Sequence, residues 1–160
     1  MTDVEIRPTR FGAPVAQQMV AAAMADLAAR YGGSGDSNPI EPTEFDPPDG
    51  CFFVAYQQGQ PVACGGWRTL GLTSGDVPEE IAEVKRFYAT PAVRGTGVAA
   101  ALLRALEDSA RAAGMREIWL ETGDKQPEAI RFYAKQGYAR ITDYGYYKDA
   151  PGVRSFGRAL

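Results

Sequence analysis

The chain has 160 residues, a formal net charge of −3 and no histidine. Its length suits one domain, residues 1–160, that buries a core without metal or disulfide support, and its charge gives no basic footprint for nucleic acid. Without histidine, Ser-His-Asp and Cys-His catalysis and histidine-ligated metals are excluded, so we expect no metal and assign proton transfer to other side chains or water.

The apolar stretches are far shorter than the roughly 20 residues that span a bilayer, so we expect no membrane partner. Residues 1–5 lack the basic-then-apolar pattern of a signal peptide, which indicates a cytoplasmic protein. Two cysteines, Cys51 and Cys64, are too few for a disulfide framework. If the chain turns at 58–59, Cys64 lies opposite Phe53 rather than Cys51, which also disfavours a bridge.

The first half of the chain reads as a strand, a helix, a long loop and a hairpin. The strand is predicted at 4–8, and the helix at 15–30 carries its apolar residues on one face. The segment 31–50 is rich in Gly and Pro, which predicts a long loop. The hairpin strands are predicted at 51–56 and 61–70.

The second half alternates further strands and helices. Apolar residues at four-residue spacing, followed by Gly114, make the helix at 97–113 the clearest of them. The other predicted elements are strands at 81–90, 117–122, 138–147 and 154–160, and a helix at 127–136. This order predicts an α/β (α+β) fold, a sandwich around one central sheet.

The segment between the strand at 81–90 and the helix at 97–113 carries the strongest functional signal. It reads Arg94-Gly95-Thr96-Gly97-Val98-Ala99. A helix N-terminus offers unpaired N–H groups and a positive dipole end, and glycines let a phosphate approach the backbone closely. Arg94 adds a positive charge. The segment therefore predicts a seat for a phosphate or pyrophosphate.

Two familiar phosphate ligands fit this segment less well. A nucleoside triphosphate loop requires Lys followed by Ser or Thr after its second glycine, and neither is present. A dinucleotide fingerprint fits Gly95-x-Gly97-x-x-Ala100, with Glu121 as the ribose-binding acid. Four residues separate its glycines from the strand, however, and about 40 residues after Glu121 are too few for the rest of that fold.

Two segments resemble motifs of the GNAT family of N-acetyltransferases. The acetyl-CoA motif Gln/Arg-x-x-Gly-x-Gly/Ala is matched by Arg94, Gly97 and Ala99. The motif A-x-x-[FL]-Y-x-x-x-G-[FY] is matched by residues 129–138, on the predicted helix after the next strand. The run from Glu121 to Pro127 resembles a bacterial subgroup that acts on small molecules or amines. The resemblance implies a mixed central sheet of six to seven strands flanked by about four helices.

The resemblance also implies where acetyl-CoA binds as acyl donor. The backbone N–H groups of Arg94, Gly95, Thr96, Gly97, Val98 and Ala99 would hold the CoA pyrophosphate. Phe87, Tyr88 and Ala89 would lie along the pantetheine arm, which pairs with the backbone as an added strand would. The strands at 81–90 and 117–122 would splay to make its slot. Gln126 stands where many members have an Asn that bonds the pantetheine.

The expected acceptor is an amine, which must lose a proton before it attacks a thioester. Glu83 is the first candidate base, because some members have a glutamate six residues before the position of Ala89. It shares a strand side with Phe87 and Ala89 if no bulge intervenes. Glu121 is the second candidate, and water is a third. Tyr133 occupies the position of the family's tyrosine acid, which would protonate the CoA thiolate.

The predicted reaction is direct attack, in a ternary complex, of a primary amine of a small molecule or peptide on acetyl-CoA. The acidic loop at 31–50 either closes over a cationic amine or stays solvated. Tyr88, Tyr144, Tyr146 and Tyr147 either line the acceptor pocket or pack in the core. A homodimer is expected from resemblance alone. The alternative functions are a catalytically silent CoA-binding domain and, less favoured, a dinucleotide-dependent oxidoreductase.

Overall fold

A mixed seven-stranded sheet forms the centre of the computed structural model, which describes residues 3–75 and 77–160. The strand order is β1-β2-β3-β4-β5-β7-β6, and β4 and β5 are the parallel neighbours in it. The strands are β1 (Glu5–Pro8), β2 (Gly50–Gln57), β3 (Gln60–Thr69), β4 (Ile81–Ala89), β5 (Glu117–Gly123), β6 (Ala139–Arg140) and β7 (Val153–Ala159). The predicted mixed sheet of six to seven strands is confirmed.

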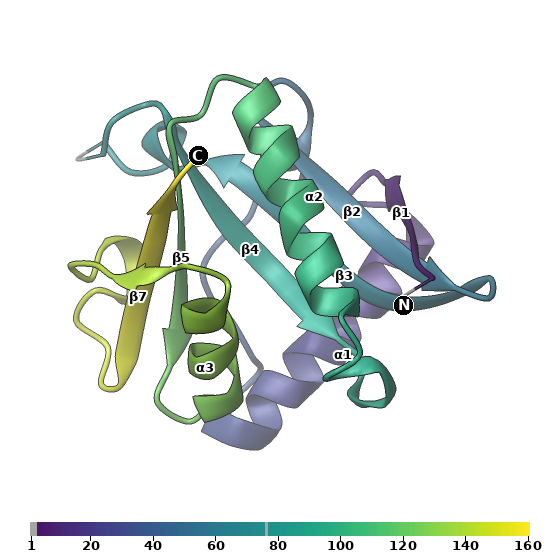
Figure 1. The fold of residues 1–160 in the computed structure, drawn as a ribbon. Helices are drawn as coiled ribbons and strands as arrows, with labels where there is room; N and C mark the ends of the chain where they lie inside the picture. Colours follow the sequence, from purple (N-terminus) through teal and green to yellow (C-terminus); the bar gives the residue numbers. More distant parts are fainter. Residues whose placement is uncertain (1–2, 76) are drawn as a thin grey trace.

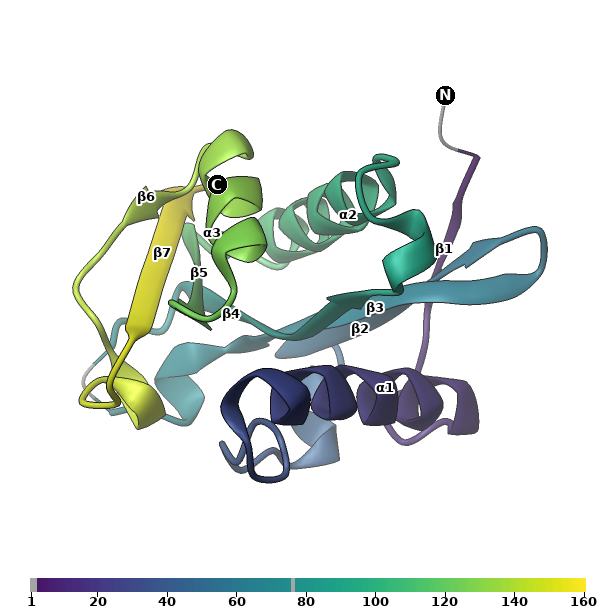
Figure 2. The same cartoon turned by 90° about the horizontal axis from the view of Figure 1, so that it is seen from below.

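Three α-helices, rather than about four, flank the sheet within the described residues: α1 (Pro14–Tyr31), α2 (Val98–Ala112) and α3 (Pro127–Lys135). The remaining helical backbone consists of short 3-10 turns. Helix α1 covers one face of the sheet, and α2 and α3 cover the other (Figure 2). None of the helices described here has the length and apolar character needed to cross a bilayer.

Each face of the sheet has its own core. The predicted apolar stripe of α2 is buried, with Leu102 and Leu106 fully enclosed against β3, β4 and β5. On the other face, Met19 and Val20 of α1 pack against Phe52 of β2. This arrangement follows from the four-residue spacing of apolar side chains on each helix, which directs one side of the helix to the sheet.

Two details differ from the sequence predictions. A bulge near Val62 shifts the hairpin register by one residue, so Cys64 lies opposite Val54, not Phe53. Both cysteines are nevertheless free. The strand predicted at 138–147 is reduced to Ala139–Arg140, because the chain then turns away from the sheet. Asp143 fixes this turn by binding the Arg140 guanidinium and the backbone N–H of Ser155.

The neighbouring strands β4 and β5 pair along a short stretch and then separate. The paired residues are Ile81–Glu83 and Glu117–Trp119, although both strands continue beyond them (Figure 1). The predicted splay of these two strands is therefore confirmed. β4 also contains a bulge, since the three residue steps from Lys85 to Tyr88 lie opposite only two steps on β3, from Gly66 to Cys64. Arg86 adopts a φ of 56° at this bulge.

Candidate active site

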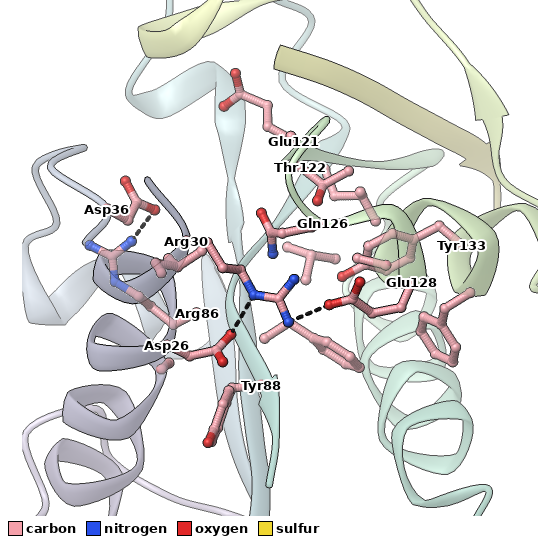
Figure 3. A pocket seen from close by; sticks show the side chains of 18 of the residues that line it. Asp26, Arg30, Asp36, Arg86, Tyr88, Glu121, Thr122, Gln126, Glu128 and Tyr133 are labelled. Carbon is pink, nitrogen blue, oxygen red and sulfur yellow. Dashed lines mark hydrogen bonds and ion pairs between the residues drawn. The ribbon is translucent and has the colours of Figure 1, made fainter. Parts of the chain in front are cut away.

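The splay between β4 and β5 opens into a cavity of about 650 Å³ (Figure 3). Its walls come from the C-terminal half of α1, from β4 and β5, from α3 and from residues 150–153. The predicted site residues that line it are Phe87, Tyr88, Ala89, Arg94, Gly95, Ala99, Gln126 and Tyr133. The fold thus brings together residues from three separate parts of the sequence.

The predicted phosphate seat lies at the start of α2. Gly97 caps the helix at φ 94°, and Gly95 has φ 78°, a region that favours glycine. The first N–H groups of α2 have no partner within the helix by its geometry. Thr96, Gly97 and Val98 belong to this helix start but do not line the cavity wall. The phosphate seat therefore lies beside the cavity, and its residues Gly95 and Ala99 are at the cavity edge.

Arg94 lies at the edge of this seat with its guanidinium partly exposed. Its Nε donates a hydrogen bond to the carbonyl oxygen of Ala89, at 3.1 Å, and its Nη2 lies 3.7 Å from Asp26 Oδ1. The guanidinium also lies 5.7 Å from the ring centre of Tyr88. These contacts hold a positive charge between the end of β4 and the start of α2, where an anionic ligand would meet it.

Across the cavity, Arg30 ties the end of α1 to the start of α3. Its guanidinium forms ion pairs with Asp26, at 3.3 Å, and with Glu128 (Figure 3). The neighbouring Tyr31 hydroxyl donates to the amide oxygen of Gln126, at 3.2 Å. Sequence reasoning missed this bridge, because its partners are about 100 residues apart and no local pattern links them.

Tyr133 places a buried phenol in the cavity wall. Its ring packs against Phe87, at 6.2 Å between ring centres, and Phe132, at 5.3 Å. Burial raises the pKa of Tyr133 above its ordinary value, so the hydroxyl keeps its proton at neutral pH. A protonated phenol in this position is suited to donating a proton or a hydrogen bond to a ligand.

Glu83 does not reach the cavity. Its side chain is 1% exposed, and its two carboxylate oxygens accept hydrogen bonds from Arg68 Nε, at 3.0 Å, and from the Tyr144 hydroxyl, at 2.9 Å. The bulge at Arg86 intervenes between Glu83 and Phe87, so the two side chains do not share a face of β4. The structure therefore does not bring Glu83 next to Tyr133.

Glu121, by contrast, lines the cavity near the end of β5. Both of its carboxylate oxygens are shielded from solvent, and neither has a hydrogen-bond partner among residues 3–75 and 77–160. Burial and the nearby charge of Glu83 raise the pKa of Glu121 to about 7. The Glu121 carboxyl is therefore about half protonated near neutral pH.

Part of the predicted long loop reaches the cavity through Asp36. Its carboxylate accepts hydrogen bonds from Lys85 Nζ, at 2.9 Å, and from the Tyr147 hydroxyl, at 2.6 Å, and it also pairs with Arg86. Although burial opposes ionisation, Lys85 and Arg86 lower the pKa of Asp36 to about 2. The loop is thereby fixed to β4, not left in solvent at this point.

The four tyrosines that were expected either to line the acceptor pocket or to pack in the core lie in three different environments. Tyr88 and Tyr147 line the cavity, Tyr144 is buried beside Glu83, and Tyr146 is exposed. Cys64 is fully buried, and its thiol donates to the Arg86 carbonyl, at 3.3 Å. Burial raises the pKa of Cys64 to about 12, so this thiol is not a nucleophile at neutral pH.

Comparison with known proteins identifies relatives for the larger part of the chain. Residues 16–138 match the family model of the Acetyltransferase (GNAT) family. An IAA acetyltransferase from Azospirillum brasilense is 38% identical over 104 residues, which are 65% of this chain and 64% of that relative. The match thus spans less than two thirds of that relative's length.

Solved structures share the fold at lower identity. The GNAT domain of S. lividans PAT has a TM-score of 0.75 at 22% identity, covering 98% of this chain and 90% of that one. A GNAT family acetyltransferase from Elizabethkingia anophelis, solved with acetyl-CoA bound, has a TM-score of 0.67 at 14% identity and covers 98% of each chain. At these identities the likeness shows the fold alone.

Proposed function

The chain belongs to the acetyltransferase (GNAT) family, and we propose that it transfers an acetyl group from acetyl-CoA to a primary amine of a small molecule or peptide. The transfer is a direct attack of the amine on the thioester in a ternary complex. The observation that carries this proposal is the cavity between β4 and β5, which joins the phosphate seat at Gly95 to the phenol of Tyr133.

In this proposal the acyl donor, acetyl-CoA, lies between the splayed strands β4 and β5. The backbone N–H groups of Gly95, Gly97, Val98 and Ala99 hold the pyrophosphate, and the Arg94 guanidinium adds its charge. The N–H groups of Arg94 and Thr96, which the sequence also assigned to this role, instead donate to the carbonyl oxygens of Pro91, at 3.3 Å, and Val93, at 3.2 Å. The backbone of β4 from Phe87 to Ala89, free of pairing with β5 at this depth, binds the pantetheine arm as an added strand. Gln126, which also lines the cavity, supplies an amide from the opposite side.

The chemistry requires one proton to leave the amine and another to reach the sulfur. The C–N bond forms as the amine attacks the thioester carbonyl carbon, and the C–S bond then breaks. Tyr133 donates a hydrogen bond and then the proton to the departing thiolate. Burial keeps the phenol protonated until that step. Glu83, Glu121 or water accepts the amine's proton, and of the two carboxylates Glu121 lines the cavity.

Two measurements test the function. In thermal denaturation, acetyl-CoA should stabilise the protein and NAD should not, because the opening between β4 and β5 suits the linear pantetheine arm of CoA and not the second nucleoside that follows the pyrophosphate of NAD. A thiol-release assay over a panel of primary amines and amine-bearing peptides should then show turnover. IAA should be tested beside the amine panel, because the A. brasilense relative carries its name.

The outcomes separate the alternatives. Stabilisation by acetyl-CoA with turnover of at least one amine supports the transferase. Stabilisation without turnover of any acceptor favours a silent CoA-binding domain, and stabilisation by NAD instead of acetyl-CoA favours the dinucleotide alternative. The amine that is turned over with the highest kcat/KM defines the acceptor class.

A further inference from the structure

Within the proposed acetyl transfer, on which this inference rests, we propose that Glu121 is the general base and that Glu83 is a positioning residue. The acceptor amine would enter as its ammonium form and give one proton to a Glu121 carboxylate oxygen. Glu83 would instead hold β3 and the segment after β6 in place, through Arg68 and Tyr144, beside the part of the cavity that Glu121 lines.

The first support is the contrast in hydrogen bonding between the two carboxylates. Both oxygens of Glu83 are occupied, one by Arg68 and one by Tyr144. Both oxygens of Glu121 lack a partner in the part of the chain that the structure describes, although each is shielded from bulk water. A shielded carboxylate without a donor is costly, and an ammonium group in the cavity would supply that donor.

The second support is the position of Glu121 relative to the sheet. Ile118 and Leu120 of β5 pack into the core under α2, whereas Trp119 packs against Tyr144 on the opposite face, at 5.1 Å. Side chains alternate along a strand, so Glu121 lies on the face of Trp119. Tyr133 approaches from the other face, with α3. The base and the acid therefore stand on the two sides of the splayed opening.

The charges around Glu121 come from three elements. Glu83 and Lys85 face it from β4, Asp36 faces it from the loop after α1, and Asp143 faces it from the segment after β6. Lys85 is already paired with Asp36. Glu83, Asp36 and Asp143 are themselves ion-paired, with Arg68, Arg86 and Arg140, so Glu121 is the carboxylate of this group that lacks a hydrogen-bond partner among the described residues. Burial, followed by the charge of Glu83, keeps a proton on Glu121 up to about neutral pH.

Glu121 and Tyr133 together account for every proton that moves in the reaction. The ammonium gives its first proton to Glu121, and the free amine attacks the carbonyl carbon. When the C–S bond breaks, the thiolate takes the Tyr133 hydroxyl proton. The second proton on nitrogen leaves as the amide forms and restores the phenol, through solvent in the cavity. The proton on Glu121 is released to solvent, so the turnover liberates one proton.

The test is the pH dependence of kcat/KM for the acceptor in Glu121→Gln, Glu83→Gln and a control, Glu117→Gln. Glu117 is an exposed glutamate at the other end of the same strand. At pH 7 we expect Glu121→Gln to lower kcat/KM about 100-fold or more. The defect should shrink toward pH ~10, where a free alkylamine no longer needs a base. Stabilisation by acetyl-CoA should be unchanged.

Three outcomes decide the assignment. An unchanged pH profile in Glu121→Gln overturns it, as does a Glu83→Gln variant that loses the low-pH activity while Glu121→Gln retains it. A Glu83→Gln variant that is less heat-stable but keeps the wild-type pH profile supports the positioning role. A wild-type protein that binds acetyl-CoA but turns over no amine overturns the proposed function itself, which the acetyl-CoA binding step distinguishes from failure of the base alone.

Discussion

Glu121 and Tyr133 lie on opposite faces of the sheet and line the same cavity, because β4 and β5 separate beyond Glu83 and Trp119. In a fully paired sheet, backbone hydrogen bonds would fill the space between the two side chains. The short parallel pairing therefore creates the opening in which a thioester can meet an amine from the other side. The predictions below test the residues on each side of it.

Replacement of Tyr133 by Phe should lower kcat about 100-fold, because the thiolate loses its proton donor. Binding of acetyl-CoA should change by less than about twofold, since the ring remains packed against Phe87 and Phe132. Steady-state kinetics and calorimetric titration measure the two effects. Tyr56→Phe is the matched control, because Tyr56 packs under Arg7 at the far edge of the sheet. An undiminished kcat would remove Tyr133 from the proton transfer.

Gly95→Ala and Gly114→Ala form a matched pair for the phosphate seat. Both glycines have positive φ, 78° and 91°, and a Cβ would meet no atom within 4 Å at either position. Each variant should therefore lose about 1–2 kcal/mol of stability from backbone strain. Gly95→Ala should in addition bind acetyl-CoA about tenfold more weakly, since its methyl group lies at the seat. Equal affinity in the two variants would place the pyrophosphate elsewhere.

Glu83→Gln should destabilise the protein by about 2 kcal/mol, because it removes one charge of a buried ion pair with Arg68 while the ion pair of Arg68 with Glu44, at 2.6 Å, remains. For a chain of this length that corresponds to a fall in Tm of roughly 4–8 °C. Thermal denaturation measures the shift, with Glu79→Gln, an exposed glutamate, as the control. A Tm within about 2 °C of the wild type would show that the pair contributes little to folding.

Glu121→Gln should stabilise the protein at high pH. The pKa of this carboxyl is about 7 in the folded chain and 4.5 ordinarily, so its ionisation opposes folding. The free energy of unfolding of the wild type should equal that of the variant below pH ~4.5 and should fall below it as pH rises from there through 7. Above pH 7 the wild type should be less stable by roughly 1–2 kcal/mol, after allowance for partial solvent exposure. Thermal denaturation at pH 4 and pH 8 measures the difference. A constant difference at both values would contradict the raised pKa.

Much of the donor side of the site is predictable from the sequence because it is local. The segment from Arg94 to Ala99 and the helix that carries Tyr133 are contiguous, and their glycines and apolar spacing fix the backbone over a few residues. The acceptor side is less predictable. The bulge at Arg86, the link from Asp36 to Lys85 and the Arg30–Glu128 pair all join segments distant in sequence or alter register without a local signal.

The sequence by itself determined the order of elements, the glycine-lined helix start and the position of the phenol, because each depends on neighbouring residues and on helix or strand periodicity. The tertiary structure decided that both carboxylate oxygens of Glu83 accept hydrogen bonds and that those of Glu121 have no donor among the described residues. That choice depends on Arg68 and Tyr144 being delivered to Glu83 from other parts of the fold, and on strand register, which shifts side chains between faces with a single inserted residue.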